Sequence, residues 1–449
     1  MSKIIKIKKG LDINLLGKAN KTITTVSSKS FALKPTDFIG VFPKMLVNPG
    51  DEVKAGTPVF YDKYRENIIF TSPVSGKVTE IKRGEKRLLE EIQITADNEI
   101  SYLNFKKANP KDLSKEEIIE NLLKSGVWTL IRQRPYSIIA DPDTEPKAIF
   151  ISGFDTSPLA PDYDFLIHGK GDEFQTGLNA IAKLTSGKVH LNINNDLPGS
   201  RVFTNSKNVQ VNNFTGPHPS GNVGTQINKI DPINKGDIVW YLRPQEVITI
   251  GKLFLEGKFD VSIVIALTGS EIKKTSYFKT YVGASIEGMI EKNLEQENVR
   301  CISGNVLTGT KIEKSGFLSF YDYQLTVIPE GDHYDFLGWM LPGLKKHSFY
   351  RTFMAWLTPK KKFKVHTNLN GGERAFVMTG QFERVFPLDI YPMQLLKAII
   401  IEDIDEMENL GIYEVDEEDF ALCEYISISK INIQSVVRNG LDIIRKEMS

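Results

Sequence analysis

The sequence predicts a multidomain protein of mixed α/β and α+β class that ends in a helical region. Three observations predict it: the chain has 449 residues, its first hundred residues carry closely spaced turn signals, and strand and helix patterns alternate after them. At roughly 100–200 residues per domain, this length corresponds to about two to four cores. We expect four units, over residues 1–104, 105–258, 259–345 and 346–449.

The first unit has the pattern of a compact β domain. Short runs rich in Ile, Val and Phe are cut by turns at 48–51, 55–58 and 72–76. The Gly-Asp and Ser-Gly turns resemble those of the barrel-sandwich hybrid of biotinyl and lipoyl domains. Such carriers modify a lysine on an exposed hairpin, and Lys63 lies in the right interval, although no Met-Lys-Met is present. The alternative is an unmodified lysine on a structural domain.

The second unit has the pattern of a Rossmann-like α/β domain. Ser114 followed by Glu117 predicts a capping box, with a helix that begins there and ends at Gly126. Further on, strands over 148–152 and 188–193 flank a helix predicted over 172–184. This alternation favours a parallel sheet.

The last two units differ in their patterns. The third combines a strand over 261–267, a short helix near 283–293 and a hairpin over 317–328, which fits a small α+β domain. The fourth is helical and acidic from about Pro387, with clustered carboxylates at 414–419.

Charge and cysteine content exclude several function classes. Fifty-six Lys and Arg balance 56 Asp and Glu, which excludes binding of nucleic acid or of an anionic membrane through a bulk basic field. Cys301 and Cys423 are too few for a disulfide framework or a four-cysteine metal site. The six histidines show no metal-ligand spacing and no catalytic motif is present, so we predict no metal site and no catalytic residue. No apolar run approaches the ~18–20 residues of a membrane span, and the start does not read as a signal peptide.

Nine short strings between residues 9 and 423 occur in one order along the chain. They are Lys9–Asp12, Asn48–Val53, Arg83–Arg87, Gly216–Pro219, Leu267–Gly269, Pro329–Gly331, Phe336–Trp339, Leu369–Arg374 and Asp416–Cys423. Each string is weak by itself. Their ordered combination resembles NqrA, the A subunit of the sodium-translocating NADH:quinone oxidoreductase.

This resemblance implies a peripheral subunit on the cytoplasmic side of the bacterial inner membrane, without a transmembrane helix. The complex of that family has six subunits, oxidises NADH, reduces quinone and exports Na⁺. The partners would be the other five, which carry the letters B to F, chiefly the B subunit in the membrane. The resemblance also implies a β-grasp-like third unit and a chain that is not catalytic alone.

The resemblance further implies that flavins and the iron–sulfur cluster lie on partner subunits. The wider relatives, the C subunit of Rnf-type complexes and the flavin subunit of complex I, have a glycine-rich flavin loop after the helix that follows the first domain. Here bulky residues occupy 125–136, so we predict no bound FMN. Cys423 alone cannot hold a cluster in the C-terminal helices. Gln226 and Asn228 stand where the family often has histidines, and His218 remains.

Quinone is the one ligand that the resemblance suggests for this chain. A quinone site is mostly aromatic and aliphatic with a few polar groups. The residues that fit this composition are Trp128, Arg132, Arg134, Tyr136, Phe31, Phe38 and Phe42. Under the alternative, the aromatic residues pack between domains, and the arginines pair with the acidic tail or with a partner subunit. The chain would then be a scaffold without a quinone site.

Overall fold

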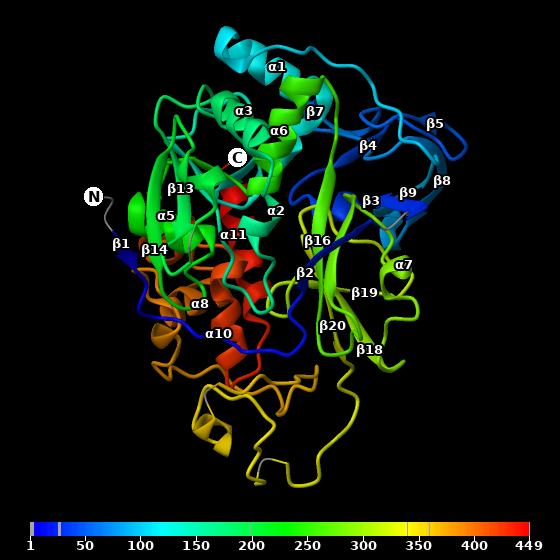
Figure 1. Cartoon of the computed structure of the whole chain (residues 1–449). Coiled ribbons are helices and arrows are strands. Elements are labelled where there is room, and N and C mark those ends of the chain that lie inside the picture. Colours follow the sequence, from blue (N-terminus) through cyan, green and yellow to red (C-terminus); the bar gives the residue numbers. More distant parts are fainter. Residues whose placement is uncertain (1–3, 26–27, 198, 339, 359, 449) are drawn as a thin grey trace.

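The computed structural model describes residues 4–25, 28–197, 199–338, 340–358 and 360–448, and Trp339 lies outside them. In the described residues the strands form four sheets (Figure 1). No helix in these ranges is long and apolar enough to cross a membrane. The expected mixture of sheets, followed by helices in the C-terminal region, is confirmed.

The β-rich unit is built from two small sheets that enclose one apolar core. One sheet has the order β3 (Ser30–Leu33), β9 (Leu89–Ala96), β8 (Gly76–Arg83), β5 (Glu52–Val53), and the other β4 (Pro43–Met45), β6 (Pro58–Asp62), β7 (Arg65–Thr71). Gly76 has φ +153°, and a Cβ there would lie 2.0 Å from the Thr95 carbonyl oxygen, so this turn requires glycine. Lys63 is exposed in the turn between β6 and β7, as the hairpin prediction required.

The first described residues belong to other sheets. Strand β1 (Ile4–Lys6) pairs in parallel with β14 (Gln210–Thr215), and β2 (Asn20–Thr25) pairs in parallel with β17 (Ser276–Tyr281). The expectation of one unit over 1–104 therefore differs from the structure at its start. Short runs such as β1 and β2 take their partner from the fold, and local sequence does not specify it.

The α/β unit centres on a seven-stranded sheet with the order β1-β14-β13-β12-β15-β10-β11. Its remaining strands are β12 (Ala148–Ser152), β13 (Lys188–Asn194), β15 (Val239–Leu242), β10 (Arg132–Arg134) and β11 (Ile138–Ile139). The first five strands in this order, β1-β14-β13-β12-β15, pair in parallel. Strands β10 and β11 add an antiparallel edge. Its helices are α1 (Lys115–Ser125), α2 (Tyr163–Leu166), α3 (Gly171–Ile181), α4 (Arg201–Thr204), α5 (Val223–Ile230) and α6 (Pro244–Glu256).

The local predictions for this unit are confirmed. Ser114 and Glu117 form the capping box of α1, and Gly126 closes the helix with φ +78°. The strand over 148–152 is observed at those bounds. The predicted helix over 172–184 corresponds to α3, which ends three residues earlier.

The central sheet is apolar on both faces. Ile149 and Ile151 of β12 share a core with Phe174 of α3 and Val247 of α6. Phe150, between those two isoleucines, belongs to a second core. Because successive side chains of a strand point to opposite faces, β12 needs cover on both sides. The second core contains side chains of α5 and of the C-terminal helices.

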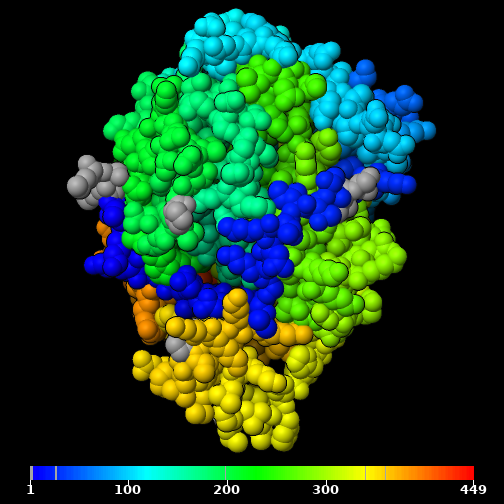
Figure 2. Space-filling view, viewed as in Figure 1, coloured from blue at the N-terminus to red at the C-terminus, as the bar shows by residue number. Residues whose placement is uncertain are grey.

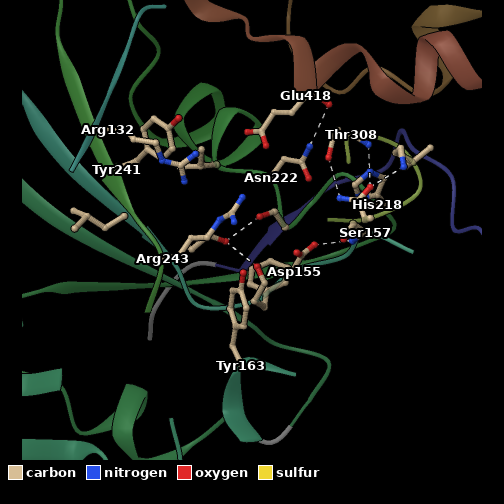
Figure 3. Close-up of a pocket in the computed structure, with 17 residues that line it drawn as sticks. Arg132, Asp155, Ser157, Tyr163, His218, Asn222, Tyr241, Arg243, Thr308 and Glu418 are labelled. Atoms are coloured by element: carbon tan, nitrogen blue, oxygen red, sulfur yellow. Dashed lines mark hydrogen bonds between the residues drawn. The ribbon is translucent and has the colours of Figure 1, made fainter. Parts of the chain in front are cut away.

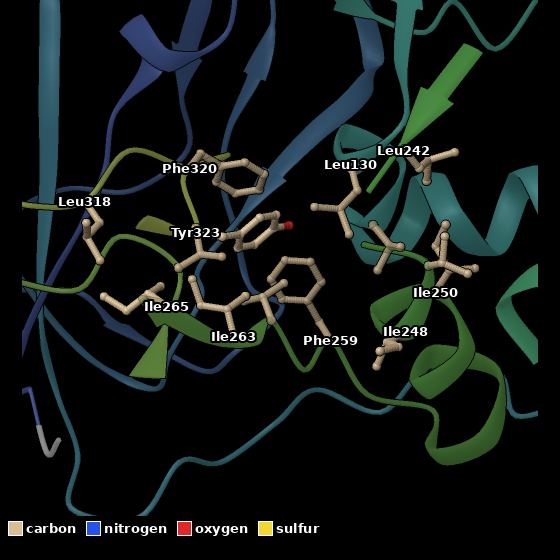
Figure 4. Packing of buried hydrophobic residues seen from close by; sticks show 14 of the residues in the cluster. Leu130, Leu242, Ile248, Ile250, Phe259, Ile263, Ile265, Leu318, Phe320 and Tyr323 are labelled. Atoms are coloured by element: carbon tan, nitrogen blue, oxygen red, sulfur yellow. The ribbon is translucent and has the colours of Figure 1, made fainter. Parts of the chain in front are cut away.

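The third unit is a six-stranded sheet with the order β19-β18-β20-β16-β17-β2. Its strands are β16 (Ser262–Thr268), β17, β18 (Val299–Ser303), β19 (Thr310–Ile312) and β20 (Gln324–Pro329), with α7 (Glu287–Ile290) between them. The predicted hairpin over 317–328 is wrong: β20 lies between β18 and β16, while Leu318, Phe320 and Tyr323 turn into the core. In Figure 4, Phe320 and Tyr323 lie on the side that faces Leu130, and Leu242 of the α/β unit belongs to the same core.

The C-terminal region covers the second face of the α/β sheet. Its helices are α8 (Pro392–Ile400), α9 (Ile404–Asn409), α10 (Ala421–Ile426) and α11 (Ile433–Glu447). The range 346–391 was expected to be mostly helical, but its described residues, 346–358 and 360–391, are irregular apart from short 3-10 helices and an isolated bridge at Phe363. Glycines at 371, 372 and 380 interrupt any helical pattern there. The 3-10 helices of the chain are η1 (Pro35–Asp37), η2 (Glu85–Arg87), η3 (Pro110–Asp112), η4 (Val127–Leu130), η5 (Met354–Leu357), η6 (Phe382–Arg384), η7 (Ile412–Glu414) and η8 (Glu417–Phe420).

The double-sided burial of β12 predicts a large effect of Phe150→Ala. Phe150 is fully buried and its ring stacks on His190 with centroids 4.7 Å apart. Deleting this ring leaves a cavity and costs about 3–5 kcal/mol of stability, read as a fall in the denaturant midpoint. Phe42→Ala is the matched control, since Phe42 is 55% exposed, and its loss should stay within roughly 1 kcal/mol. Equal midpoints for the two variants would contradict this packing.

Candidate functional site

A small cavity lies at the carboxyl ends of β12 and β15 (Figure 3). From β12 the chain continues to β13 on one side, whereas β15 lies on the other side of β12. Open α/β sheets bind ligands at such a topological switch point. The cavity has a volume of about 70 Å³, enough for several water molecules. The third unit and the C-terminal region also contribute lining residues, among them Asn305, Thr308 and Glu418.

Arg132 lines this cavity and is held between two aromatic rings. Its guanidinium carbon lies 4.5 Å from the ring centroid of Tyr241 and 4.5 Å from that of Tyr321. Glu246 Oε1 is 3.9 Å from Arg132 Nη2. Burial acts to lower the pKa of Arg132, but Tyr241 and Glu246 outweigh it and the pKa is raised. The cation is therefore stabilised within the chain.

Arg243 forms the opposite wall at the start of α6. Its Nη1 donates to the Tyr321 carbonyl oxygen at 2.5 Å, and its backbone N–H donates to Glu246 Oε2 at 2.6 Å. Glu246 is buried at the third position of α6. There its carboxylate accepts a hydrogen bond from the backbone of the cap residue and interacts favourably with the positive end of the helix dipole. The Glu246 carboxylate thus contacts both cavity arginines: the guanidinium of Arg132 and the backbone N–H of Arg243.

His218 lines the cavity from the loop after β14. Its Nδ1 is 3.1 Å from Thr156 Oγ1, and its backbone N–H donates to Asp12 Oδ1 at 2.9 Å. Burial lowers the pKa of His218 to about 4, against the opposing charges of Asp155 and Asp12. The imidazole is therefore neutral at pH 7, and its contacts are those of a residue that fixes the loop.

Gln226 has a structural role in the polar network beside this loop. Its side chain accepts from Asn192 Nδ2 at 2.8 Å and donates to Ser152 Oγ at 2.8 Å. Asn228 donates to Glu414 Oε2 at 2.9 Å, which links α5 to the C-terminal region. Among the described residues no cluster of three or more His, Cys, Asp or Glu side chains could hold a metal ion.

Arg134 lies two residues beyond Arg132 and is completely buried among carboxylates. Its Nη1 donates to Asp419 Oδ2 at 2.7 Å and its Nη2 to Glu418 Oε1 at 2.7 Å, with Asp416 Oδ2 3.6 Å away. The alternative that an arginine of this segment pairs with the acidic tail is confirmed for Arg134. Breaking such a buried ion pair from one side leaves an uncompensated charge.

The comparisons with known proteins follow the same domain order. Three family models match: the NqrA N-terminal barrel-sandwich hybrid domain over residues 5–97, the NqrA second alpha/beta domain over 113–259, and the NQRA C-terminal domain over 264–314. The A subunit of Na⁺-translocating NADH-quinone reductase from Yersinia pseudotuberculosis is 38% identical over 99% of this chain and 100% of its own length. The proteins of that name from Photorhabdus laumondii and Haemophilus influenzae are 39% and 38% identical, each over 99% of this chain and 100% of their own length.

The chain belongs to the NqrA family. The family models confirm the predicted barrel-sandwich hybrid and the α/β unit that follows it. A crystal structure of an NAD⁺-reducing NiFe hydrogenase is 10% identical, with a TM-score of 0.39 over 76% of this chain and 62% of the other. A likeness at that level supports no argument about shared fold or function.

Membership in the NqrA family does not by itself place the seven residues predicted to lie near quinone. Trp128 is buried, donates its indole N–H to the Ala140 carbonyl at 2.8 Å, and packs on Trp240. Phe31 and Phe38 lie in the core of the β-rich unit. Phe42 is exposed and contacts Tyr64.

Two of the seven residues, Phe38 and Arg132, contact the same third side chain, Tyr321. Phe38 packs on Tyr321 at 5.7 Å, and the other contacts of Tyr321 include Arg132. Tyr136 is separate: its ring packs on Tyr413, and its carbonyl accepts from Arg438. Of the seven, only Arg132 lines the cavity.

Among the cavity residues that sequence reasoning missed are Tyr163, Tyr241, Arg243 and Asp155. Two of them had a local signal, since Asp155 and Arg243 come shortly after apolar strands of a predicted parallel sheet. Residues at those positions gather at the carboxyl edge of such a sheet. The tyrosines carry no comparable signal.

In the Arg134 cluster, Asp419 is predicted to make a contribution to stability that falls between about pH 4 and pH 7. Burial raises the pKa of Asp419 to about 7, although Arg134 acts to lower it. In the unfolded chain the pKa of an aspartate is about 3.9, so the folded state binds more protons between these values. The contribution of this group to stability therefore declines as the pH rises from about 4 to about 7, and is lost above that range.

The measurement is denaturant unfolding at several pH values for the wild type and for Asp419→Asn. Relative to the wild type, the stability of the variant should increase as the pH rises through this window, because asparagine does not titrate and the contribution of Asp419 that declines is absent. Asp97→Asn, at an exposed position, should give a profile parallel to that of the wild type. Because the lowered pKa of His218 acts in the opposite direction over part of this window, the comparison with the variant decides. A difference between wild type and Asp419→Asn that does not change with pH across the window would refute the assignment.

Proposed function

We propose that this chain acts as the A subunit of a Na⁺-translocating NADH-quinone reductase, in a peripheral position on the cytoplasmic side of the membrane. The observation that carries the proposal is similarity from end to end. Relatives with that name are 38–39% identical over 99% of this chain and 100% of their own length. Chains this similar over their full length share their domain arrangement, which supports a shared place in the complex.

In this proposal the partner subunits, chiefly the B subunit in the membrane, carry electron transfer, and this chain binds no flavin or iron–sulfur cluster. The segment at the place of the flavin loop supports this. The Thr129 N–H donates to the Gly126 carbonyl, and the Ile131 N–H donates to the Trp128 carbonyl, so these amides are not free to bind a phosphate. Burial raises the pKa of the Cys423 thiol well above its usual value, which disfavours the thiolate that a cluster requires.

The geometry favours a scaffold role over a quinone site on this chain. Trp128, Phe31 and Phe38 are buried by packing, and Arg134 is paired with carboxylates. The cavity beside Arg132 has about 70 Å³, far below the roughly 300–1,000 Å³ typical of ligand pockets. We therefore propose that quinone is bound by the membrane partner and that this chain contributes through contacts with the other subunits.

Capture of the native complex tests the proposed function. A tagged copy of the full chain is expressed in its own cells, the membranes are solubilised gently, and co-purifying proteins are identified by mass spectrometry. We expect flavin-bearing membrane subunits and Na⁺-stimulated NADH:quinone activity in the captured fraction, and neither in a purification from untagged cells. Recovery of the chain alone, with the activity left behind, would overturn the proposal.

Kinetics of the captured complex test the scaffold role. In Arg132→Ala, the KM for quinone should stay within about two-fold of the wild type, because the cavity does not hold the substrate. Arg201→Ala, which removes an exposed arginine from α4, is the matched control. An increase of about ten-fold in the quinone KM of Arg132→Ala, with unchanged subunit composition, would instead place quinone in the cavity.

A further inference from the structure

Residues 334–364 form a lobe that differs from the rest of the chain in charge. The lobe contains seven Lys or Arg and one acidic residue, Asp335, a formal charge of +6. The remaining 49 basic and 55 acidic residues give the rest of the chain a formal charge of −6. The neutral total therefore conceals a separation of charge. The basic residues are Lys345, Lys346, Arg351, Lys360, Lys361, Lys362 and Lys364.

The same lobe exposes large apolar side chains. Phe336 is 89% exposed, and Met340, Leu341, Leu344, Trp356 and Leu357 are about half exposed or more. Monomeric proteins rarely expose so many apolar side chains in one short segment without using them for binding. In Figures 1 and 2 the lobe is the yellow part that projects from one end of the molecule, away from the α/β unit.

The lobe is attached to the body at its base. The Phe363 ring is buried, and its N–H donates to the Asn14 carbonyl at 2.8 Å. Lys364 Nζ lies 2.7 Å from Glu271 Oε1, and the Tyr350 hydroxyl donates to the Ile426 carbonyl at 3.0 Å. Three exposed lysines, Lys345, Lys360 and Lys362, have no ion pair or side-chain hydrogen bond within the described part of the chain. Their charge is available to an outside partner.

We infer that this lobe docks the chain on an anionic lipid surface. Basic residues combined with exposed Trp, Phe and Leu are the chemistry of the membrane interface, where lysines meet headgroup phosphates and apolar side chains enter the boundary with the acyl chains. In the described residues of the lobe the backbone is irregular apart from η5 and an isolated bridge at Phe363, so only side chains can enter. The cytoplasmic loops of membrane proteins carry an excess of Lys and Arg, which would repel this lobe; lipid is therefore the favoured partner.

The choice of lipid over a protein partner rests on the cytoplasmic position in the proposed function, whereas the charge and the apolar side chains belong to the lobe itself. Vesicle binding is measured on this chain alone, so it can hold where the proposed function fails. The test uses the purified full chain and vesicles of phosphatidylcholine, with or without about 30 mol% phosphatidylglycerol, in a flotation assay. We expect binding only to the anionic vesicles, weakening as salt rises because exposed charges are screened.

Charge reversal at the three free lysines is the decisive variant. Lys345→Glu, Lys360→Glu and Lys362→Glu together should lower the partition coefficient on the order of 100-fold or more. The matched control is Lys44→Glu, Lys54→Glu and Lys77→Glu, which reverses three exposed lysines of the β-rich unit and should bind nearly as the wild type does. Circular dichroism verifies that both variants fold.

A second pair of variants tests the apolar part. Phe336→Ser with Leu357→Ser should weaken vesicle binding at high salt, where the electrostatic part is screened. Phe42→Ser with Leu88→Ser, which changes two exposed apolar residues outside the lobe, should leave vesicle binding unchanged. Failure of the wild type to bind anionic vesicles would overturn the inference. So would lysine reversal that spares vesicle binding but releases the partner subunits in detergent, because the lobe would then be a protein contact.

Discussion

The need to bury both faces of one parallel sheet organises this molecule. Phe150 points to one face of β12, and its neighbours Ile149 and Ile151 point to the other, so the strand is stable only between two layers. Helices α3 and α6 cover one face. The other face is covered by α5 and by helices that the chain supplies more than 240 residues later. The C-terminal region is therefore a layer of the α/β unit, and its position brings Glu418 to the cavity at the switch point.

The same layer explains the charges around the cavity. Arg134 enters the contact between sheet and C-terminal region, where Asp416, Glu418 and Asp419 surround it. Arg132 is held by two tyrosine rings and Arg243 by a carbonyl oxygen and the cap of α6. Each of these cations thus has an ion pair, a ring contact or a hydrogen bond within the chain, although Nε of Arg132 and of Arg134 has no hydrogen-bond partner among the described residues. The cavity at this switch point is correspondingly small, about 70 Å³.

Local sequence predicted what depends on local contacts. The capping box at Ser114, the C-cap at Gly126 and the strand over 148–152 follow from residue type and spacing, and the structure has them. It did not predict that β1 and β2 join two distant sheets, because edge pairing depends on partners more than 200 residues away. The Arg134–Asp419 pair spans 285 residues and was foreseen only as an alternative, through complementary charge. The contacts of Arg132 with Tyr241 and Tyr321 have no sequence signal. The seven residues of the predicted quinone site were chosen by their composition, which does not show where the fold places them.

Native-state hydrogen exchange of the full chain under mild denaturant tests the shared core most directly. If the C-terminal helices are the second layer of the sheet, the amides of β12 and of α11 open at the same free energy and respond equally to denaturant, as one cooperative unit. The β-rich unit supplies an internal reference that is free to open separately. Exchange of α11 at a much lower free energy, while β12 stays protected, would show that the sheet keeps its core without the C-terminal region and would contradict the account.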